Sequence, residues 1–231
     1  MGEMTMFTAV RIAWAMVPAL LRFFRSDYVD VNDFLGVMDN LQDIAMPRVL
    51  ANPHLRAIAS RPLMAPLPPV AELLAHPEGS IGHVLGTFLR AQGFDHIRVN
   101  VEDNEAGRVR AWVEQTHDLW HVVTGFGSDL PGEMGLQAFY LAQLGPPPSQ
   151  MAIGALLLRN LTAEPARVQA LMDAVAFGWH QGRTAEQVAG IDWHAELMTP
   201  VRELRARLGL SPATGALAAG RYHEDRAAHA A

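Results

Sequence analysis

Apolar positions recur three and four residues apart along most of the chain, and the strict alternation typical of strands is almost absent. One strand-like run, 97–101, has no second alternating segment with which to pair. We therefore expect an all-α fold: a single-domain bundle with irregular packing over residues 1–210, followed by a disordered tail over 211–231. The pattern predicts a bundle of about eight helices. Helical spacing covers 6–24, 30–45, 81–92, 107–124, 131–144, 149–160, 165–181, the short segment 184–189, and 200–208. The prolines of 47–69 divide that stretch into shorter helical pieces.

The first of these segments, 6–24, is apolar almost throughout and is long enough to suggest a membrane span. Arg11 near its middle and the lack of a second such span argue against that interpretation. A secretory signal is a poor match, because the basic leading region is missing. Two interpretations stay open: a helix of the core or of a dimer interface, and a helix lying on a membrane surface, which Arg22 and Arg25 would favour.

Composition limits the chemistry available. Half of the 231 residues are apolar, so a sizeable core can form, and the absence of cysteine excludes disulfides and thiolate metal sites. Any metal must therefore be held by histidine and carboxylate. The net charge of −6 and the lack of a basic cluster argue against nucleic acid as a partner. All basic side chains other than histidine are arginine, which, with the abundant Ala, Gly and Pro, indicates a bacterial source.

The richest chemistry lies in the stretch from Thr116 to Glu133. If 107–124 is helical, His117 and His121 lie one above the other on one face, because residues four apart nearly eclipse on an α-helix. Two imidazoles so placed can share one metal ion. Asp118 lies about 60° around the helix from His121, so it can join them as a ligand or accept a ring N–H as an outer partner.

A turn after this helix would bring back a further ligand. Gly125 and Gly127 permit a sharp reversal, and Ser128, Asp129 and Pro131 are typical of a helix start. A second helix beginning near Pro131 would carry Glu133 in its first turn. The resulting nitrogen and oxygen set suits zinc and is plausible for iron, manganese or another divalent ion. The alternative is that the histidines are ordinary polar residues of an amphipathic helix and that Glu133 only complements the helix dipole.

The pattern His117-Asp118-x-x-His121, eleven residues, Glu133, with Gly132 before the glutamate, resembles the signature of the coenzyme Q (ubiquinone) biosynthesis protein 4 family. Similarity continues on both sides of the motif, at Phe88-Leu-Arg90, Phe139, Gln143, Trp193-His-Ala-Glu196 and Val201 to Gly209. The chain departs from the family in the helix after the glutamate, where Gln137 and Tyr140 stand in place of a lysine and an acidic residue.

The resemblance implies an α-helical homodimer of the quinone pathway, peripheral on the inner membrane from the cytoplasmic side if the source is bacterial. It also implies a divalent metal at His117, Asp118, His121 and Glu133, with zinc first and iron or magnesium as alternatives. An apolar groove would take the isoprenoid tail of a quinone precursor. Trp112 and Trp120, eight residues apart on one helix face, are the contacts we would choose for that tail.

Two functions follow from the resemblance and stay open. One is metal-dependent oxidative decarboxylation, with hydroxylation at ring carbon one, of a polyprenyl-hydroxybenzoate-type head group. The other is a non-enzymatic lipid-binding scaffold that organises other ubiquinone-biosynthesis proteins at the membrane. A helical metal-dependent hydrolase is disfavoured, because no further spaced histidines and aspartates are present to complete such a site.

Overall fold

The computed structural model describes residues 6–25, 42–93, 99–145, 147–161 and 163–213, and no β-strand occurs in these ranges. The all-α prediction is confirmed. Most of the helix predicted over 30–45, part of the strand-like run and nearly all of the predicted tail lie outside the described residues. The described helices are α1 (Met6–Arg25), α3 (Gln42–Val49), α4 (Pro53–Ala59), α5 (Val70–Leu73), α6 (Ile81–Ala91), α7 (Glu105–Thr124), α8 (Leu130–Leu144), α9 (Pro147–Arg159), α10 (Pro165–Thr184), α11 (Trp193–Glu196) and α12 (Val201–Leu208).

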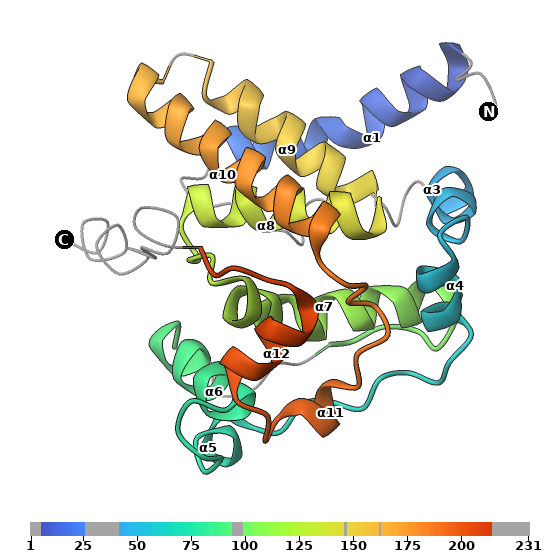
Figure 1. The fold of residues 1–231 in the computed structure, drawn as a ribbon. Helices are drawn as coiled ribbons and strands as arrows, with labels where there is room; N and C mark the ends of the chain where they lie inside the picture. The colour runs from blue at the N-terminus through green and yellow to red at the C-terminus, as the bar shows by residue number, and fades with distance from the viewer. Residues whose placement is uncertain (1–5, 26–41, 94–98, 146, 162, 214–231) are drawn as a thin grey trace.

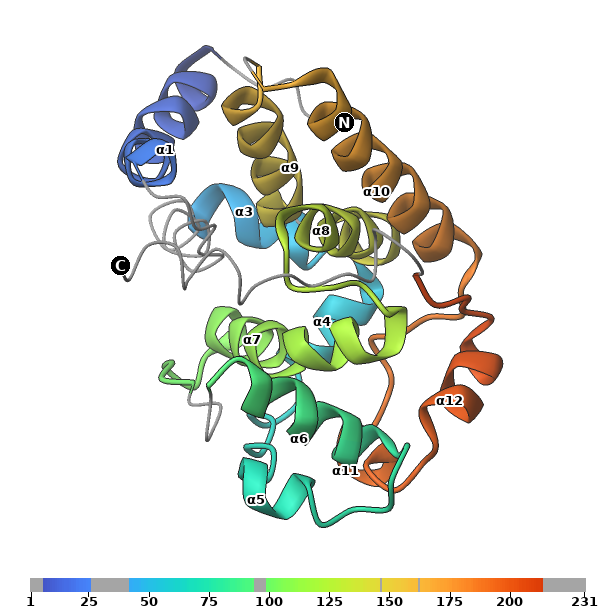
Figure 2. The same cartoon turned by 90° about the vertical axis from the view of Figure 1, so that its left-hand side faces the viewer.

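Helix α7 runs through the middle of the molecule and separates two groups of helices. Helices α8, α9 and α10 lie on one side of it, whereas α5, α6, α11 and α12 lie on the other (Figures 1 and 2). Trp120 of α7 is fully buried at the centre of the main core, in edge contact with Trp193 at a ring separation of 4.8 Å. The buried face of α7 therefore organises the whole fold.

The closest helix pair, α8 and α10, is held at short range by glycine. A Cβ on Gly178 would collide with the carbonyl oxygen of Gly135, and a Cβ on Gly182 would meet the Cβ of Ala142 at 2.7 Å. The two backbones thus approach closely at Gly178 and Gly135, where neither helix carries a side chain, and Gly182 leaves room for the Cβ of Ala142. This contact fixes the helix whose first turn carries Glu133.

Helix α6 begins as its sequence predicts and is tied to the start of α12. Ser80 caps it by accepting a hydrogen bond from the backbone N–H of His83. The backbone N–H groups of Ile81 and Gly82 donate to the carbonyls of Thr199 and Leu197, at 2.8 Å each. The N-terminus of α6 is therefore anchored to a segment more than a hundred residues further along the chain.

The helix predicted over 184–189 is wrong. Helix α10 ends at Thr184, and the following residues form no helix because side chains take over their backbone hydrogen bonds. The Gln143 amide donates to the carbonyl of Ala185 at 3.3 Å and accepts from the N–H of Val188 at 3.2 Å. The Gln187 side chain accepts from the N–H groups of Val188 and Ala189. These contacts compete with helix formation.

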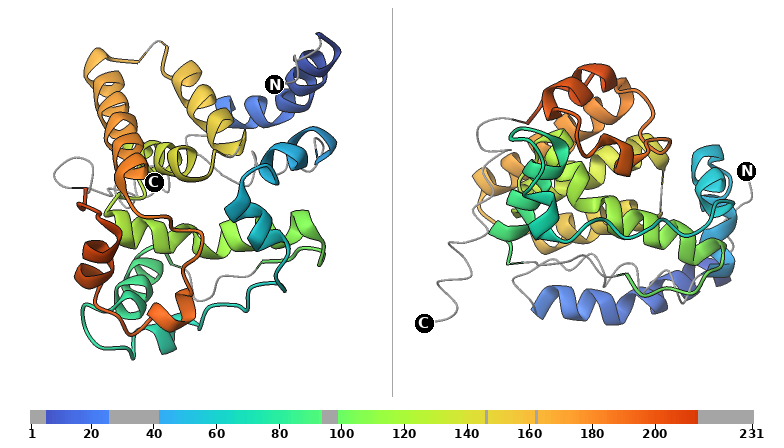
Figure 3. Two further views of the ribbon diagram at one scale, coloured as in Figure 1. Left: turned by 45° about the vertical axis from the view of Figure 1, so that its right-hand side comes forward. Right: turned by 90° about the horizontal axis from the view of Figure 1, so that it is seen from below.

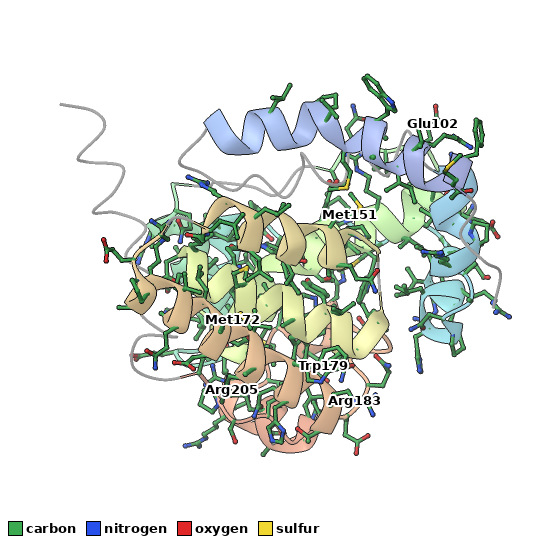
Figure 4. All side chains as sticks on the ribbon, turned by 90° about the horizontal axis from the view of Figure 1, so that it is seen from above. Glu102, Met151, Met172, Trp179, Arg183 and Arg205 are labelled. Atoms are coloured by element: carbon green, nitrogen blue, oxygen red, sulfur yellow. The ribbon has the colours of Figure 1, made fainter. Side chains whose placement is uncertain are left out.

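Helix α1 forms as predicted but is not a core helix. Its inner face, Ile12, Ala15 and Met16, packs on Met151 of α9. Figures 3 and 4 show α1 along the edge of the molecule, and Figure 4 labels Met151 beside it. The outer face exposes large apolar side chains at alternating intervals of three and four residues: Phe7, Val10, Trp14, Val17 and Leu21. Among the helices of the described ranges, none is both long and apolar enough to cross a membrane.

Candidate metal centre

The end of α7 is built to reverse the chain. Gly125 adopts φ 78°, the left-handed conformation favoured by glycine, and its N–H donates to the carbonyl of His121 at 2.9 Å. From the other side, the N–H of Ala213 donates to the Thr124 carbonyl at 2.9 Å. Helix α7 therefore ends one turn after His121, as the sequence predicts.

The start of α8 returns the chain towards the two histidines. Asp129 caps the helix by accepting from the N–H of Gly132 at 2.9 Å, and Pro131 occupies its first turn. A Cβ at Gly132 would collide with the Gly127 carbonyl, so only glycine allows this tight entry. Glu133 consequently lies in the first turn of α8, as predicted.

Three side chains converge on one point. His121 Nε2 lies 3.2 Å from His117 Nε2 and 3.1 Å from Glu133 Oε1, and His117 Nε2 lies 3.6 Å from Glu133 Oε2. Two ligands of a tetrahedral zinc ion, each about 2.0–2.2 Å from the metal, are about 3.3–3.5 Å apart. The three separations, of which the two to Glu133 involve different carboxylate oxygens, bracket that value. His117, His121 and Glu133 form a group that can hold one metal ion.

The hydrogen bonding of His121 also fits a metal. Its Nδ1 lies 3.2 Å from the Phe126 carbonyl, which can only accept, so the ring proton is assigned to Nδ1. Its Nε2, on the side of the carboxylate and the other imidazole, is then the atom that would bind a metal once its own proton is displaced. Glu133 Oε2 is buried without a hydrogen-bond partner. A cation between these atoms would bind both Nε2 and the carboxylate oxygen.

Interactions within the site shift the pKa values of Glu133 and His117. Burial raises the pKa of Glu133, but the rings of His121 and His117 lower it more, so it lies far below the usual glutamate range. Burial lowers the pKa of His117, but Glu133 and, to a smaller extent, Asp118 more than compensate, so it lies above the ordinary histidine value. Glu133 is therefore anionic at neutral pH, as a metal ligand must be.

Neighbouring aromatic rings hold the two histidines in place. Phe88 of α6 stacks on His121 at 5.3 Å and 20°, and Tyr140 of α8 stacks on His117 at 6.4 Å and 7°. Arg205 of α12 donates to the carbonyls of Val123 and Val122, each at 2.8 Å, and so satisfies the end of α7. The Arg205 contact has no local pattern that would reveal it in the sequence.

Comparison with known proteins identifies the family. A family model described as Coenzyme Q (ubiquinone) biosynthesis protein Coq4 matches residues 49–214, which include the whole three-residue group and the helices around it. The chain belongs to the Coq4 family.

Similar members of the Coq4 family are fungal proteins named ubiquinone biosynthesis protein, mitochondrial. The one from Talaromyces stipitatus is 28% identical over 139 residues, covering 58% of this chain and 47% of that protein. The one from Phaeosphaeria nodorum is 28% identical over 170 residues, covering 71% and 57%. The chain thus spans about half the length of the curated relatives it matches.

A solved structure also resembles this member of the Coq4 family. It is a crystal structure from Nostoc punctiforme PCC 73102 whose name refers to ubiquinone biosynthesis, with a TM-score of 0.72 and 26% sequence identity. The match covers 87% of this chain and 97% of that one. It therefore extends over most of the fold described above.

Gln137 and Tyr140, the two positions at which the sequence analysis found a departure from the family pattern, both make specific contacts in α8. The side-chain amide oxygen of Gln137 accepts from the Ser149 hydroxyl at 2.8 Å, which ties α8 to α9. Tyr140 packs its ring between His117 and Trp120. Burial raises the pKa of the Tyr140 phenol well above its usual value, and the Asp118 carboxylate adds to that effect. Both residues therefore support the site through packing of the helix.

The other residues that the sequence analysis selected, Asp118, Trp112 and Trp120, lie outside the group formed by His117, His121 and Glu133. Asp118 contributes no atom to the group, although its pKa responds to both histidines and to Glu133. Trp120 is 0% exposed, and its indole N–H donates to Thr116 Oγ1 at 3.0 Å. Trp112 lines a surface cavity. The isoprenoid contacts chosen at Trp112 and Trp120 stay predictions, and the packing of Trp120 makes Trp112 the better candidate.

Proposed function

We propose that this chain uses a divalent metal at His117, His121 and Glu133 to catalyse oxidative decarboxylation of a polyprenyl-hydroxybenzoate-type head group in ubiquinone biosynthesis. The observation that carries the proposal is the three-ligand set. Structural zinc sites are closed by four protein ligands, whereas catalytic sites use three and leave a position for substrate. Within the described ranges, the group of mutually close ligand atoms ends at three residues.

The reaction replaces the ring carboxyl with a hydroxyl at the same carbon. The carboxyl leaves as carbon dioxide; with molecular oxygen and water as co-reactants, one oxygen atom enters the ring and hydrogen peroxide is released. A bound divalent ion would act as a Lewis acid towards the carboxylate and phenol oxygens of the head group. Zinc, the first choice for this ligand set, is redox-inert, so oxygen must then react directly with the electron-rich ring; iron and magnesium are the alternatives.

The protein groups divide the remaining tasks. Glu133 stays ionised, holds the third ligand position and balances the charge of the ion. Burial raises the pKa of Asp118 against the opposing effect of His117 and His121, so this carboxyl can carry a proton at higher pH than an exposed aspartate. We assign to Asp118 the proton transfer at the head group.

Incubation of the metal-loaded protein alone with the prenylated hydroxybenzoate precursor under air tests this function. Release of carbon dioxide from the ring carboxyl supports the enzyme, and an Asp118→Asn variant should keep its metal but turn over about 100-fold more slowly. Bound metal with unchanged substrate would instead favour the non-enzymatic lipid-binding scaffold that presents precursors to other pathway proteins.

Metal affinity should fall on acidification, beginning above pH 6.5, the ordinary pKa of a histidine side chain. The raised pKa of His117 means that a proton competes for its Nε2 at higher pH than at an ordinary histidine. Competition against a chelator from about pH 5.5 to about pH 8 measures this effect. An affinity independent of pH over that range would show that His117 is not a ligand.

Membrane contact is assigned to α1, whose apolar stripe suits the boundary between head groups and acyl chains. Trp14 lies in the middle of this stripe and is 70% exposed. A Trp14→Glu variant should bind phospholipid vesicles at least about tenfold more weakly in co-sedimentation, because a charge replaces an interfacial aromatic ring. Trp179→Glu, at an exposed tryptophan of α10, is the matched control and should bind as the parent does; equal weakening by both would contradict the assignment.

A further inference from the structure

Helix α6 lies beside α7 (Figures 1 and 2), and one face of its C-terminal half contacts the metal centre. Phe88, one turn before the end of α6, stacks on His121 at 5.3 Å. Gln92, the C-cap residue, follows four positions later and therefore lies on the same face of the helix. Its side-chain amide nitrogen donates to the Ser128 hydroxyl at 2.7 Å. This face of α6 thus contacts both a candidate ligand on α7 and the turn that follows α7.

The turn that Gln92 contacts leads to two of the three candidate ligands. Two residues before Ser128, the Phe126 carbonyl lies 3.2 Å from Nδ1 of His121 and so orients this ring. Directly after Ser128 comes the N-cap of α8, the helix that carries Glu133 in its first turn. A displacement of Ser128 would therefore change both the orientation of His121 and the position of Glu133.

Helix α6 provides a firm support for this turn because its other contacts lie away from the metal centre. Its first N–H groups are bonded to the segment before α12, and a Cβ on Gly86 would meet the Cβ of Leu73 at 2.9 Å, so α6 also packs closely on α5. Among the described residues, the Gln92 amide is the one side chain that bonds to Ser128. Loss of this amide would leave the turn without its hydrogen bond to α6.

From these contacts we infer that Gln92 is a positioning residue of the metal centre. Through Ser128 it fixes the Phe126 carbonyl, which orients His121, and the start of the helix that carries Glu133. The inference rests on the metal site of the proposed function and adds to it a residue outside the motif. Groups that orient metal ligands contribute about 10–100-fold to metal affinity, and Gln92, acting through one further residue, belongs at the lower end of that range.

Gln92→Ala should bind a divalent metal about 10-fold more weakly than the parent in competition with a chelator. Ser128→Ala removes the other end of the same hydrogen bond and should have the same effect. The double variant should bind no more weakly than either single variant, because both substitutions break one contact. Ser128→Thr keeps the hydroxyl and should bind metal as the parent does. Gln150→Ala, at an exposed glutamine of α9, is the matched control and should also equal the parent.

Two spectroscopic measurements distinguish positioning from a general loss of stability. With cobalt(II) as the bound metal, the visible absorption of Gln92→Ala should differ from that of the parent, because this absorption reports the arrangement of the ligand atoms. Without metal, the Nδ1 proton of His121 should exchange with water faster in the variant, because its carbonyl acceptor is less firmly held. A purely structural role would lower the midpoint of thermal unfolding and leave both signals unchanged.

The outcomes separate this inference from the proposed function. Metal bound by the parent, with equal affinity and the same cobalt absorption in Gln92→Ala, would overturn the inference alone. A double variant whose loss of affinity is the product of the two single losses would also overturn it, because Gln92 and Ser128 would then act independently. A parent protein that binds no metal would overturn the metal site itself and this inference with it.

Discussion

A His117→Ala/His121→Ala double variant is expected to lose its metal, with at least about a 100-fold drop in affinity and, with it, any turnover of the head group. The reason is geometric: the two Nε2 atoms and the Glu133 carboxylate are the ligand atoms that the fold brings within one ion's reach. Elemental analysis of parent and variant, purified side by side, measures the effect. Equal metal content in both would mean that the motif is not the metal site.

A second variant should change the charge of the site while keeping its shape. Glu133→Gln retains the side-chain volume while removing the negative charge, so it should also weaken metal binding strongly without leaving a cavity. Circular dichroism establishes that each variant is folded. His54→Ala, at an exposed histidine of α4, should bind metal as the parent does. Loss of metal in this control would point to general destabilisation.

The second large effect is expected at Gly178, where an alanine should destabilise the protein by about 3 kcal/mol. The added Cβ would collide with the Gly135 carbonyl, which is backbone and cannot move away as a flexible side chain could. Denaturant unfolding measures the loss, and the midpoint of thermal unfolding should fall by roughly 6–12 °C. Because α8 carries Glu133, metal affinity should fall as well.

Gly154→Ala is the matched control for this prediction. Gly154 is also a helical glycine, on α9, but it is exposed and a Cβ there would meet no atom within 4 Å. Helix propensity alone should then stabilise the protein by up to about 1 kcal/mol. Equal changes in the two variants would show that the α8 and α10 backbones are not in tight contact.

The convergence of His117, His121 and Glu133 could be predicted from sequence because its determinants are local. Helical spacing places His117 over His121, and the glycines, the Asp129 cap and Pro131 determine the reversal that returns Glu133. All of these signals lie within one short stretch of chain. The position of Asp118 was less determined, because a residue next to a ligand on a helix can point towards the ion or beside it, and packing decides.

Features that depend on distant residues could not be predicted. The segment 184–189 has a helix-forming sequence, but the Gln143 side chain from another helix takes its hydrogen bonds. Arg205 reaches the end of α7 from a helix eighty residues further on, at donor distances of 2.8 Å. The short helices α5 and α11, of four residues each, are too brief to show a hydrophobic period. Such contacts appear only once the chain is packed.

The hydrogen bonds that Arg205 and Ala213 donate to the end of α7 can form only late in the synthesis of the chain. Arg205 and Ala213, which donate to the last carbonyls of α7, are translated 84 and 92 residues after His121. A nascent chain that already contains His117, His121 and Glu133 therefore still lacks these donors. On the proposed metal site, we expect stable binding of an ion to require the segment from Arg205 to Ala213, so that a chain ending before it would bind metal more weakly.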